Sequence, residues 1–175
     1  MSMFKSLQSM PGVITLFHSP NVKASSDVLK VLQKATTSLE SSPKSQGFLS
    51  KIFGGNSSKG VKPASRYQLD VASTFPTPDQ FLFIKGTIST HPDCKAAFKS
   101  AFPKWGETLE RARDVENLPT QSAVEKQTAG KTLDELVALK LFNPPLVVDW
   151  DNQLIASDVE GLTKVLEHYK KSEDI

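Results

Sequence analysis

The chain contains one cysteine, Cys94, and this scarcity restricts the chemistry that is open to it. A single thiol excludes an internal disulfide, a dithiol pair and a zinc site built from the cysteines of one chain. Low cysteine usage is typical of proteins that work in reducing compartments. The composition therefore predicts an intracellular protein, and any thiol cycle would need a second thiol from outside the chain.

Excess charge and long apolar runs are also lacking. The formal net charge is +2, because 21 Lys and Arg are balanced by 19 Asp and Glu, and the basic residues are scattered. That balance gives no basis for nucleic-acid binding. No apolar run reaches the roughly 18 residues that predict a membrane span. The chain also lacks a glycine-rich phosphate loop, so no nucleotide cofactor is expected.

No acidic residue occurs before Asp27. Residues 1–11 combine Lys5 with several apolar side chains, which weakly resembles the amphipathic, acid-poor pattern of a mitochondrial transit peptide. The segment contains no arginine, and the first predicted strand follows almost directly. Cleavage of such a leader would therefore remove part of the fold.

The length of 175 residues suits one domain, residues 1–175, with a core of its own. Apolar patterning predicts strands over residues 13–18, 67–71, 146–150 and 153–156. It predicts helices over residues 25–34, 77–84, 92–102, 132–141 and 157–169. The first two strands, joined by a helix, are expected to pair in parallel, and the last two, joined by a tight turn, in antiparallel fashion.

Three helix starts carry a capping-box pattern, in which Ser or Thr precedes Glu or Gln by three residues. The pairs are Thr77 with Gln80, Thr132 with Glu135 and Ser157 with Glu160. Residues 36–65, by contrast, are rich in Ser, Lys, Gly and Pro and predict a flexible insert within the domain. Its one apolar island, residues 48–53, is either a docking motif or a segment that lies loosely on the domain surface.

The stretch His18-Ser-Pro-Asn-Val22 follows an apolar strand and precedes a helix. Residues 14–29 resemble the strand–loop–helix of the arsenate reductase branch of the thioredoxin superfamily, which has a His-x-Pro-x-Cys pattern. Val22 stands where those proteins carry the reactive cysteine. The resemblance therefore implies a related fold. It does not imply redox chemistry at this loop, because the reactive thiol is replaced by Val22.

Three further motifs lie along the chain. They are Phe4-Lys-x-Leu7 leading to Ile14-Thr-Leu-Phe17, then Phe75-Pro-Thr-x-Asp-Gln80, then Leu141-Phe-Asn-Pro144 followed by Val148-Asp-Trp150. In order and spacing the chain resembles a family of small fungal mitochondrial redox proteins. The resemblance implies an α/β fold of the thioredoxin-like, three-layer type, with a mixed four-stranded sheet and flanking helices. It also implies a mitochondrial location and thiol-redox activity.

Cys94 is the candidate catalytic residue. It is predicted in the first turn of a helix, where the helix dipole favours a thiolate. His91 and Lys95 would bring positive charge close to it, whereas Asp93 would raise its pKa. With one thiol, a catalytic cycle would need an outside thiol such as glutathione to resolve a mixed disulfide. The alternative is a helix residue, half-buried, with no chemical role.

Val22, Ser19 and Pro145 form the candidate substrate-binding site. The free N–H groups at the helix start suit an anion or the carboxylate of a thiol peptide. By resemblance, Pro145 is the candidate cis-proline beside this loop, although Pro144 before it has no N–H to offer. A proline that only fixes the entry to a buried strand is the other interpretation.

Asp149 and Asp151 are two residues apart and are expected to form a solvated turn with Trp150 packed inward, so no metal site is predicted. Besides an intermediate form that binds glutathione without catalysis, two functions stay open. One is a mitochondrial thiol-redox protein that acts through Cys94 on a thiol or disulfide substrate. The other is a redox-inactive thioredoxin fold that binds peptides or protein partners through Val22 and Pro145. The position of Cys94 relative to the Val22 loop discriminates between them.

Overall fold

The structure, a computed structural model, describes residues 12–38, 67–109 and 112–171. Its centre is a four-stranded mixed sheet with the strand order β2-β1-β3-β4. The strands are β1 (Gly12–Phe17), β2 (Tyr67–Ala72), β3 (Leu146–Asp149) and β4 (Leu154–Ala156). Each lies within one residue of its predicted bounds, because short apolar runs between turn residues are a strong strand signal.

The strand directions follow from the connections. β1 pairs in parallel with β2, with Phe17 opposite Ala72 at its end. β3 is antiparallel to both of its neighbours, so that Leu146 lies opposite Phe17 and Val148 opposite Ile155. The predicted parallel first pair and antiparallel last pair are confirmed. The sheet is open, with β2 and β4 at its two edges.

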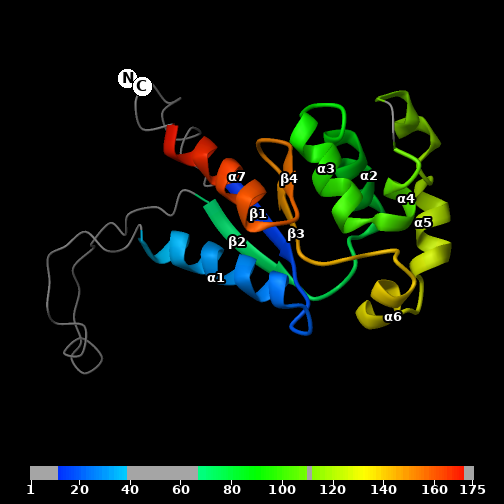
Figure 1. Cartoon of the computed structure of the whole chain (residues 1–175), viewed down its shortest axis with the longest axis horizontal. Helices are drawn as coiled ribbons and strands as arrows, with labels where there is room; N and C mark the ends of the chain where they lie inside the picture. The colour runs from blue at the N-terminus through cyan, green and yellow to red at the C-terminus, as the bar shows by residue number, and fades with distance from the viewer. Residues whose placement is uncertain (1–11, 39–66, 110–111, 172–175) are drawn as a thin grey trace, which may run out of the picture.

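Helices cover both faces of the sheet (Figure 1). The helices are α1 (Lys23–Ser38), α2 (Pro78–Thr87), α3 (Pro92–Ala101), α4 (Pro103–Gly106), the 3-10 helix η3 (Ala112–Asn117), α5 (Gln121–Thr128), α6 (Leu133–Ala138) and α7 (Val159–Lys171). α1 and α7 lie on one face, and α2 and α3 lie on the other. The molecule is therefore a mixed α/β protein with flanking helices.

Two pairs of aromatic residues mark the two faces. The ring of Tyr67 on β2 lies 5.3 Å from that of Tyr169 on α7. On the other face, the ring of Trp150 lies 4.9 Å from that of Phe83 on α2, and its Nε1 donates to Thr15 Oγ1 at 2.9 Å. Since side chains alternate along a strand, neighbouring residues of β1 contribute to different layers of the core.

Two of the three predicted capping boxes are confirmed, at Thr77 and at Thr132. The third is wrong. Asp158 Oδ1 accepts from Gly161 N at 2.6 Å, and α7 begins at the next residue, Val159. Asp158 rather than Ser157 therefore caps α7, since an Asp side chain satisfies the free N–H groups of a first turn as well as a Ser does.

The boundary of the predicted insert also needs correction. α1 continues to Ser38, so residues 36–38 belong to a helix rather than to the insert. Thr36 Oγ1 donates to the carbonyl oxygen of Leu32 at 2.7 Å within that last turn. The rest of the insert, residues 39–66, lies outside the described residues. So do residues 1–11, on which the transit-peptide prediction rests.

Candidate functional site

The loop after β1 is held by a buried serine. Ser25, in the first turn of α1, is fully buried, and its Oγ accepts from the backbone N–H of Ser19 at 3.0 Å. The same Oγ is hydrogen-bonded to His18 Nδ1 at 2.7 Å. Val22 N donates to the carbonyl oxygen of Ser19 at 3.2 Å and closes the turn. Because Ser25 is sealed inside, its contact with His18 positions the loop and does not present a nucleophile.

Pro145 lies at the same end of the sheet as this loop. The peptide bond between Pro144 and Pro145 is cis, as the sequence predicted. Leu146, the next residue, pairs with Phe17, the last residue of β1. The structure thus brings Ser19, Val22 and Pro145 to one end of the sheet. Asn21 Nδ2 also donates to Asp134 Oδ1 at 3.2 Å, which connects the loop to α6.

Cys94 lies elsewhere. It is in the first turn of α3, as predicted, but only 1% of it is exposed, so the expectation of a half-buried residue is wrong. Its thiol is hydrogen-bonded to the backbone of Ile155 in β4 and to the side chain of Thr87 in α2. β3 separates β4 from β1, and α3 and α1 lie on opposite faces of the sheet (Figure 1). The structure therefore does not join Cys94 to the predicted substrate-binding residues.

The surroundings of Cys94 disfavour its thiolate. Burial raises the pKa of the Cys94 thiol, and the charge of Asp93 adds to that rise. The hydrogen bonds from Ile155 and Thr87 act in the opposite direction and are outweighed. His91, which was expected to bring positive charge to the sulfur, has an acidic neighbour of its own, because its Nδ1 lies 3.8 Å from Asp93 Oδ2. The predicted activation of Cys94 by its helix is thus opposed by its packing.

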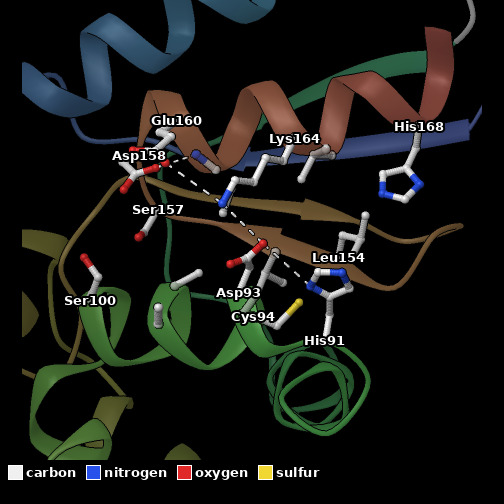
Figure 2. A pocket seen from close by; sticks show the side chains of 16 residues that line it. His91, Asp93, Cys94, Ser100, Leu154, Ser157, Asp158, Glu160, Lys164 and His168 are labelled. Carbon is white, nitrogen blue, oxygen red and sulfur yellow. Dashed lines mark hydrogen bonds and ion pairs between the residues drawn. The ribbon is translucent and has the colours of Figure 1, made fainter. Parts of the chain in front are cut away.

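A cavity of about 270 Å³ opens beside Cys94, between α3, β4 and α7 (Figure 2). Its polar groups include His91, which precedes α3, Asp93 from α3, and Lys164 and His168 from α7. Among the residues in this cavity, the sequence analysis singled out His91, Asp93 and Cys94 for their places near the thiol. It missed the contribution of α7. Only Glu160 and Lys164, four residues apart on one helix face, gave a local signal of pairing.

The acidic turn after β3 is structural. Asp149 is fully buried, so the prediction that it belongs to a solvated turn is wrong. Its Oδ1 accepts from the backbone N–H groups of Asp151 and Asn152 at 3.2 and 3.1 Å and from Tyr169 Oη at 2.9 Å. Its Oδ2 accepts from Asn152 Nδ2 at 2.8 Å. A buried carboxylate needs such donors, and here they bind the β3–β4 turn to α7.

The described residues contain neither a metal-binding cluster nor a membrane-spanning helix. Among them, no three His, Cys, Asp or Glu side chains gather in a way that could hold a metal ion. Within the same ranges, no helix has the length and apolar character needed to cross a membrane.

Comparison with known proteins places the chain in a family. Residues 4–158 fit the model of a family described as "Protein of unknown function (DUF1687)". The chain belongs to this family. No curated protein and no solved structure matches it. Because the DUF1687 description names no activity, the function of this member has to be argued from its own residues.

Proposed function

We propose that this DUF1687 protein is a thioredoxin-like module that binds peptides or protein partners without thiol catalysis. The strand order β2-β1-β3-β4, with parallel β1 and β2 and an antiparallel β3, supports a thioredoxin-like plan. The helices on both faces support the three-layer arrangement that goes with it.

One observation carries the non-catalytic assignment: the only thiol of the chain is buried and distant from the loop at which a thioredoxin-like protein exchanges disulfides. Val22 occupies that loop, whereas Cys94 packs against Ile155 on the far side of β3. Attack on a disulfide requires an accessible thiolate. Burial of Cys94 restricts access to its sulfur, and its raised pKa lowers the fraction of thiolate at neutral pH.

The rival is the monothiol redox protein that the sequence resemblance implies, with glutathione as the resolving thiol. One observation favours it, because Cys94 lines the cavity between α3, β4 and α7. A small thiol in that cavity would lie next to the sulfur. The mitochondrial location implied by the same resemblance is part of either proposal.

A glutathione-coupled disulfide reduction assay separates the two functions. The native chain and a Cys94→Ser variant are compared at equal concentration, with thermal unfolding as a check that both are folded. We expect the same background rate for both. A rate for the native chain that is well above background and lost in Cys94→Ser would overturn the proposal.

The pH dependence of alkylation gives a second test. We expect iodoacetamide to modify Cys94 in the folded protein far more slowly than it modifies a free thiol, with a half-point above the reference pKa of about 8.5. Urea above the unfolding transition should abolish the protection, because the thiol is then exposed. Fast alkylation at neutral pH in the folded state would favour the redox alternative.

A further inference from the structure

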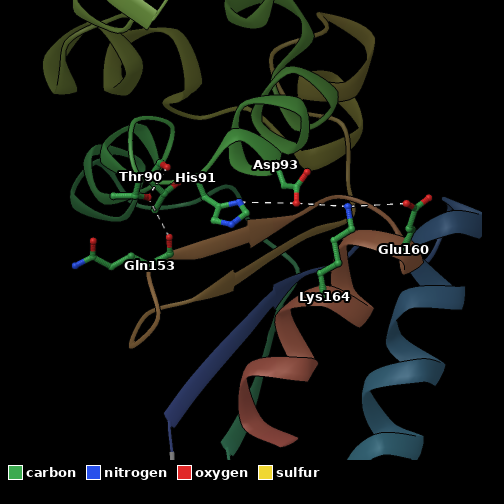
Figure 3. Close-up of polar contacts among 7 residues, drawn as sticks. Thr90, His91, Asp93, Gln153, Glu160 and Lys164 are labelled. Atoms are coloured by element: carbon green, nitrogen blue, oxygen red, sulfur yellow. Dashed lines mark hydrogen bonds and ion pairs between the residues drawn. The ribbon is translucent and has the colours of Figure 1, made fainter. Parts of the chain in front are cut away.

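The cavity between α3, β4 and α7 is lined by a row of ionisable side chains in which the acids alternate with a histidine and a lysine (Figure 3). His91 carries a charge in this row only when it is protonated. His91 Nδ1 lies 3.8 Å from Asp93 Oδ2, Lys164 Nζ lies 3.4 Å from that same oxygen, and Lys164 Nζ lies 3.9 Å from Glu160 Oε1. We call these four residues the charged row. Its members come from the start of α3, with His91 at its N-cap, and from α7, and these two helices flank the edge strand β4 from opposite faces (Figure 2).

The charged row is adjustable. The side chains of His91, Asp93 and Lys164 are 45%, 51% and 52% exposed, and that of Glu160 is 85% exposed. Ion pairs at such exposure contribute little to stability, so the groups can change partners at low cost. The charged row can therefore open for a ligand without unfolding either helix.

The inner wall of the cavity is apolar. Cys94, Leu154 and Val165 all line it and are all at least nine-tenths buried. This wall suits a short aliphatic group. The volume of about 270 Å³ lies just below the range of roughly 300–1,000 Å³ that drug-sized ligands occupy, so the occupant is small.

Lys164 lies between the two acids Asp93 and Glu160, and this order of charges determines which kind of ligand binds best. An anion that takes Lys164 draws it away from Glu160 and leaves Asp93 with His91 alone, and a cation that takes Asp93 leaves Lys164 with one acid fewer. A ligand with both charges replaces each broken pair with a new one, because its carboxylate takes Lys164 while its ammonium takes Asp93 or Glu160. Complementary pairing of this kind favours a zwitterion over an ion of either sign.

We propose that this cavity binds a small zwitterion, namely a free α-amino acid with an aliphatic side chain or the equivalent end group of a short peptide. The charged row holds its ammonium and carboxylate, and the apolar wall holds its side chain. This inference rests on the proposed binding function and names the ligand class for one of its surfaces.

Three matched ligands test it by two-dimensional NMR titration of the full chain. L-leucine carries both charges, 3-methylbutylamine lacks the carboxylate, and 4-methylpentanoate lacks the ammonium. We expect leucine to bind at least tenfold more tightly than either of the others. The amide signals that shift should be those of Asp93, Ile155 and Lys164 and their neighbours. Binding of the amine or the acid as tightly as leucine, or no leucine binding up to its solubility limit, overturns the proposal.

Variants localise the effect. Lys164→Gln and Asp93→Asn should each weaken leucine binding at least fivefold and reduce its advantage over the single-charge ligands. Lys30→Ala, which removes a surface ion pair with Asp27 on α1, is the matched control and should leave binding unchanged. Equal affinity in all variants would place the site elsewhere and reject the charged row.

The outcomes also separate this inference from the proposed function. Failure of leucine to bind, together with an inert Cys94, would reject the zwitterion site and keep the non-catalytic module. Cys94-dependent disulfide reduction, together with leucine binding that needs Lys164, would reject the module and keep the site.

Discussion

Tyr169 Oη donates to Asp149 Oδ1 at 2.9 Å, and this bond attaches the last helix to the β3–β4 turn. The two residues are 20 positions apart, and the carboxylate is fully buried. Val13 N also donates to Asp151 Oδ2 at 2.7 Å, so the same turn is fixed to the start of β1. The acidic turn therefore joins β1, the β3–β4 hairpin and α7.

Removal of the Tyr169 hydroxyl should destabilise the protein. Tyr169→Phe keeps the ring but takes one donor from a buried carboxylate, which we expect to lower the free energy of unfolding by about 1–2 kcal/mol. Urea unfolding measures the change. Tyr67→Phe is the comparison, because the Tyr67 hydroxyl lies 3.4 Å from the carbonyl oxygen of Leu32, a longer contact with a neutral group, and should cost less. An equal or smaller loss in Tyr169→Phe would contradict the role of this bond.

Both tyrosines of the chain should ionise late in the folded state. Burial and the charge of Asp149 raise the pKa of Tyr169 above its usual range, and burial raises the pKa of Tyr67. The folded state then holds more protons than the unfolded state once the pH passes about 10. Stability from these groups is complete below that pH and falls as the pH rises towards the folded-state pKa values. Absorbance at 295 nm should show less tyrosinate at pH 10 in the folded chain than after urea unfolds it.

A variant without the Tyr169 hydroxyl is the control for the predicted loss of stability at alkaline pH. Tyr169→Phe should show a smaller decrease in unfolding free energy between pH 9 and pH 11 than the native chain does. Identical slopes would mean that Tyr169 does not contribute to the linkage.

Ser25→Ala should loosen the loop after β1. The substitution leaves the N–H of the buried residue Ser19 without its acceptor, which we expect to cost about 1–3 kcal/mol in urea unfolding. Ser26→Ala, at the next and partly exposed position, should change stability by less than about 0.5 kcal/mol. If both variants unfold at the same urea concentration, the bond between Ser25 and Ser19 is dispensable.

Two glycines offer a test of backbone conformation alone. A Cβ at Gly86 or at Gly130 would meet nothing within 4 Å, but Gly130 has a φ of +69° after α5 whereas Gly86 lies within α2. Gly130→Ala should destabilise by about 1 kcal/mol, because an L-residue is strained there. Gly86→Ala should stabilise by about 0.5–1 kcal/mol, since alanine is the better helix former. Thermal unfolding resolves the opposite signs, and a shared sign would contradict the argument.

The sequence predicted the features that depend on neighbours along the chain. The four strands and the capping boxes at Thr77 and Thr132 rest on residues within a few positions of each other. α5 was missed because it buries only Val124 and therefore shows no apolar stripe. The end of α1 was missed because Thr36 is stabilised there partly by the distant Tyr67, whose Oη lies 3.4 Å from Thr36 Oγ1.

In the candidate site, too, the sequence predicted only the features that depend on neighbouring residues. Local pattern identified Cys94 at a helix start and the loop at Val22, and both elements are present. The burial of Cys94 depends on Ile155, some sixty positions later, and the charged row depends on Lys164 meeting Asp93. Contacts between distant residues of this kind leave no periodicity in the sequence, so packing alone decides them.

The ion pair between Asp93 and Lys164 also bears on self-association. An edge strand offers hydrogen-bonding groups to any other strand, and proteins with bare edges join into extended sheets. At β4 the two helices meet in front of the edge through this pair, and the backbone of Ile155 is already bonded to the Cys94 thiol. A strand from a second copy would therefore have to displace this ion pair and the Cys94 contact before it could pair with β4.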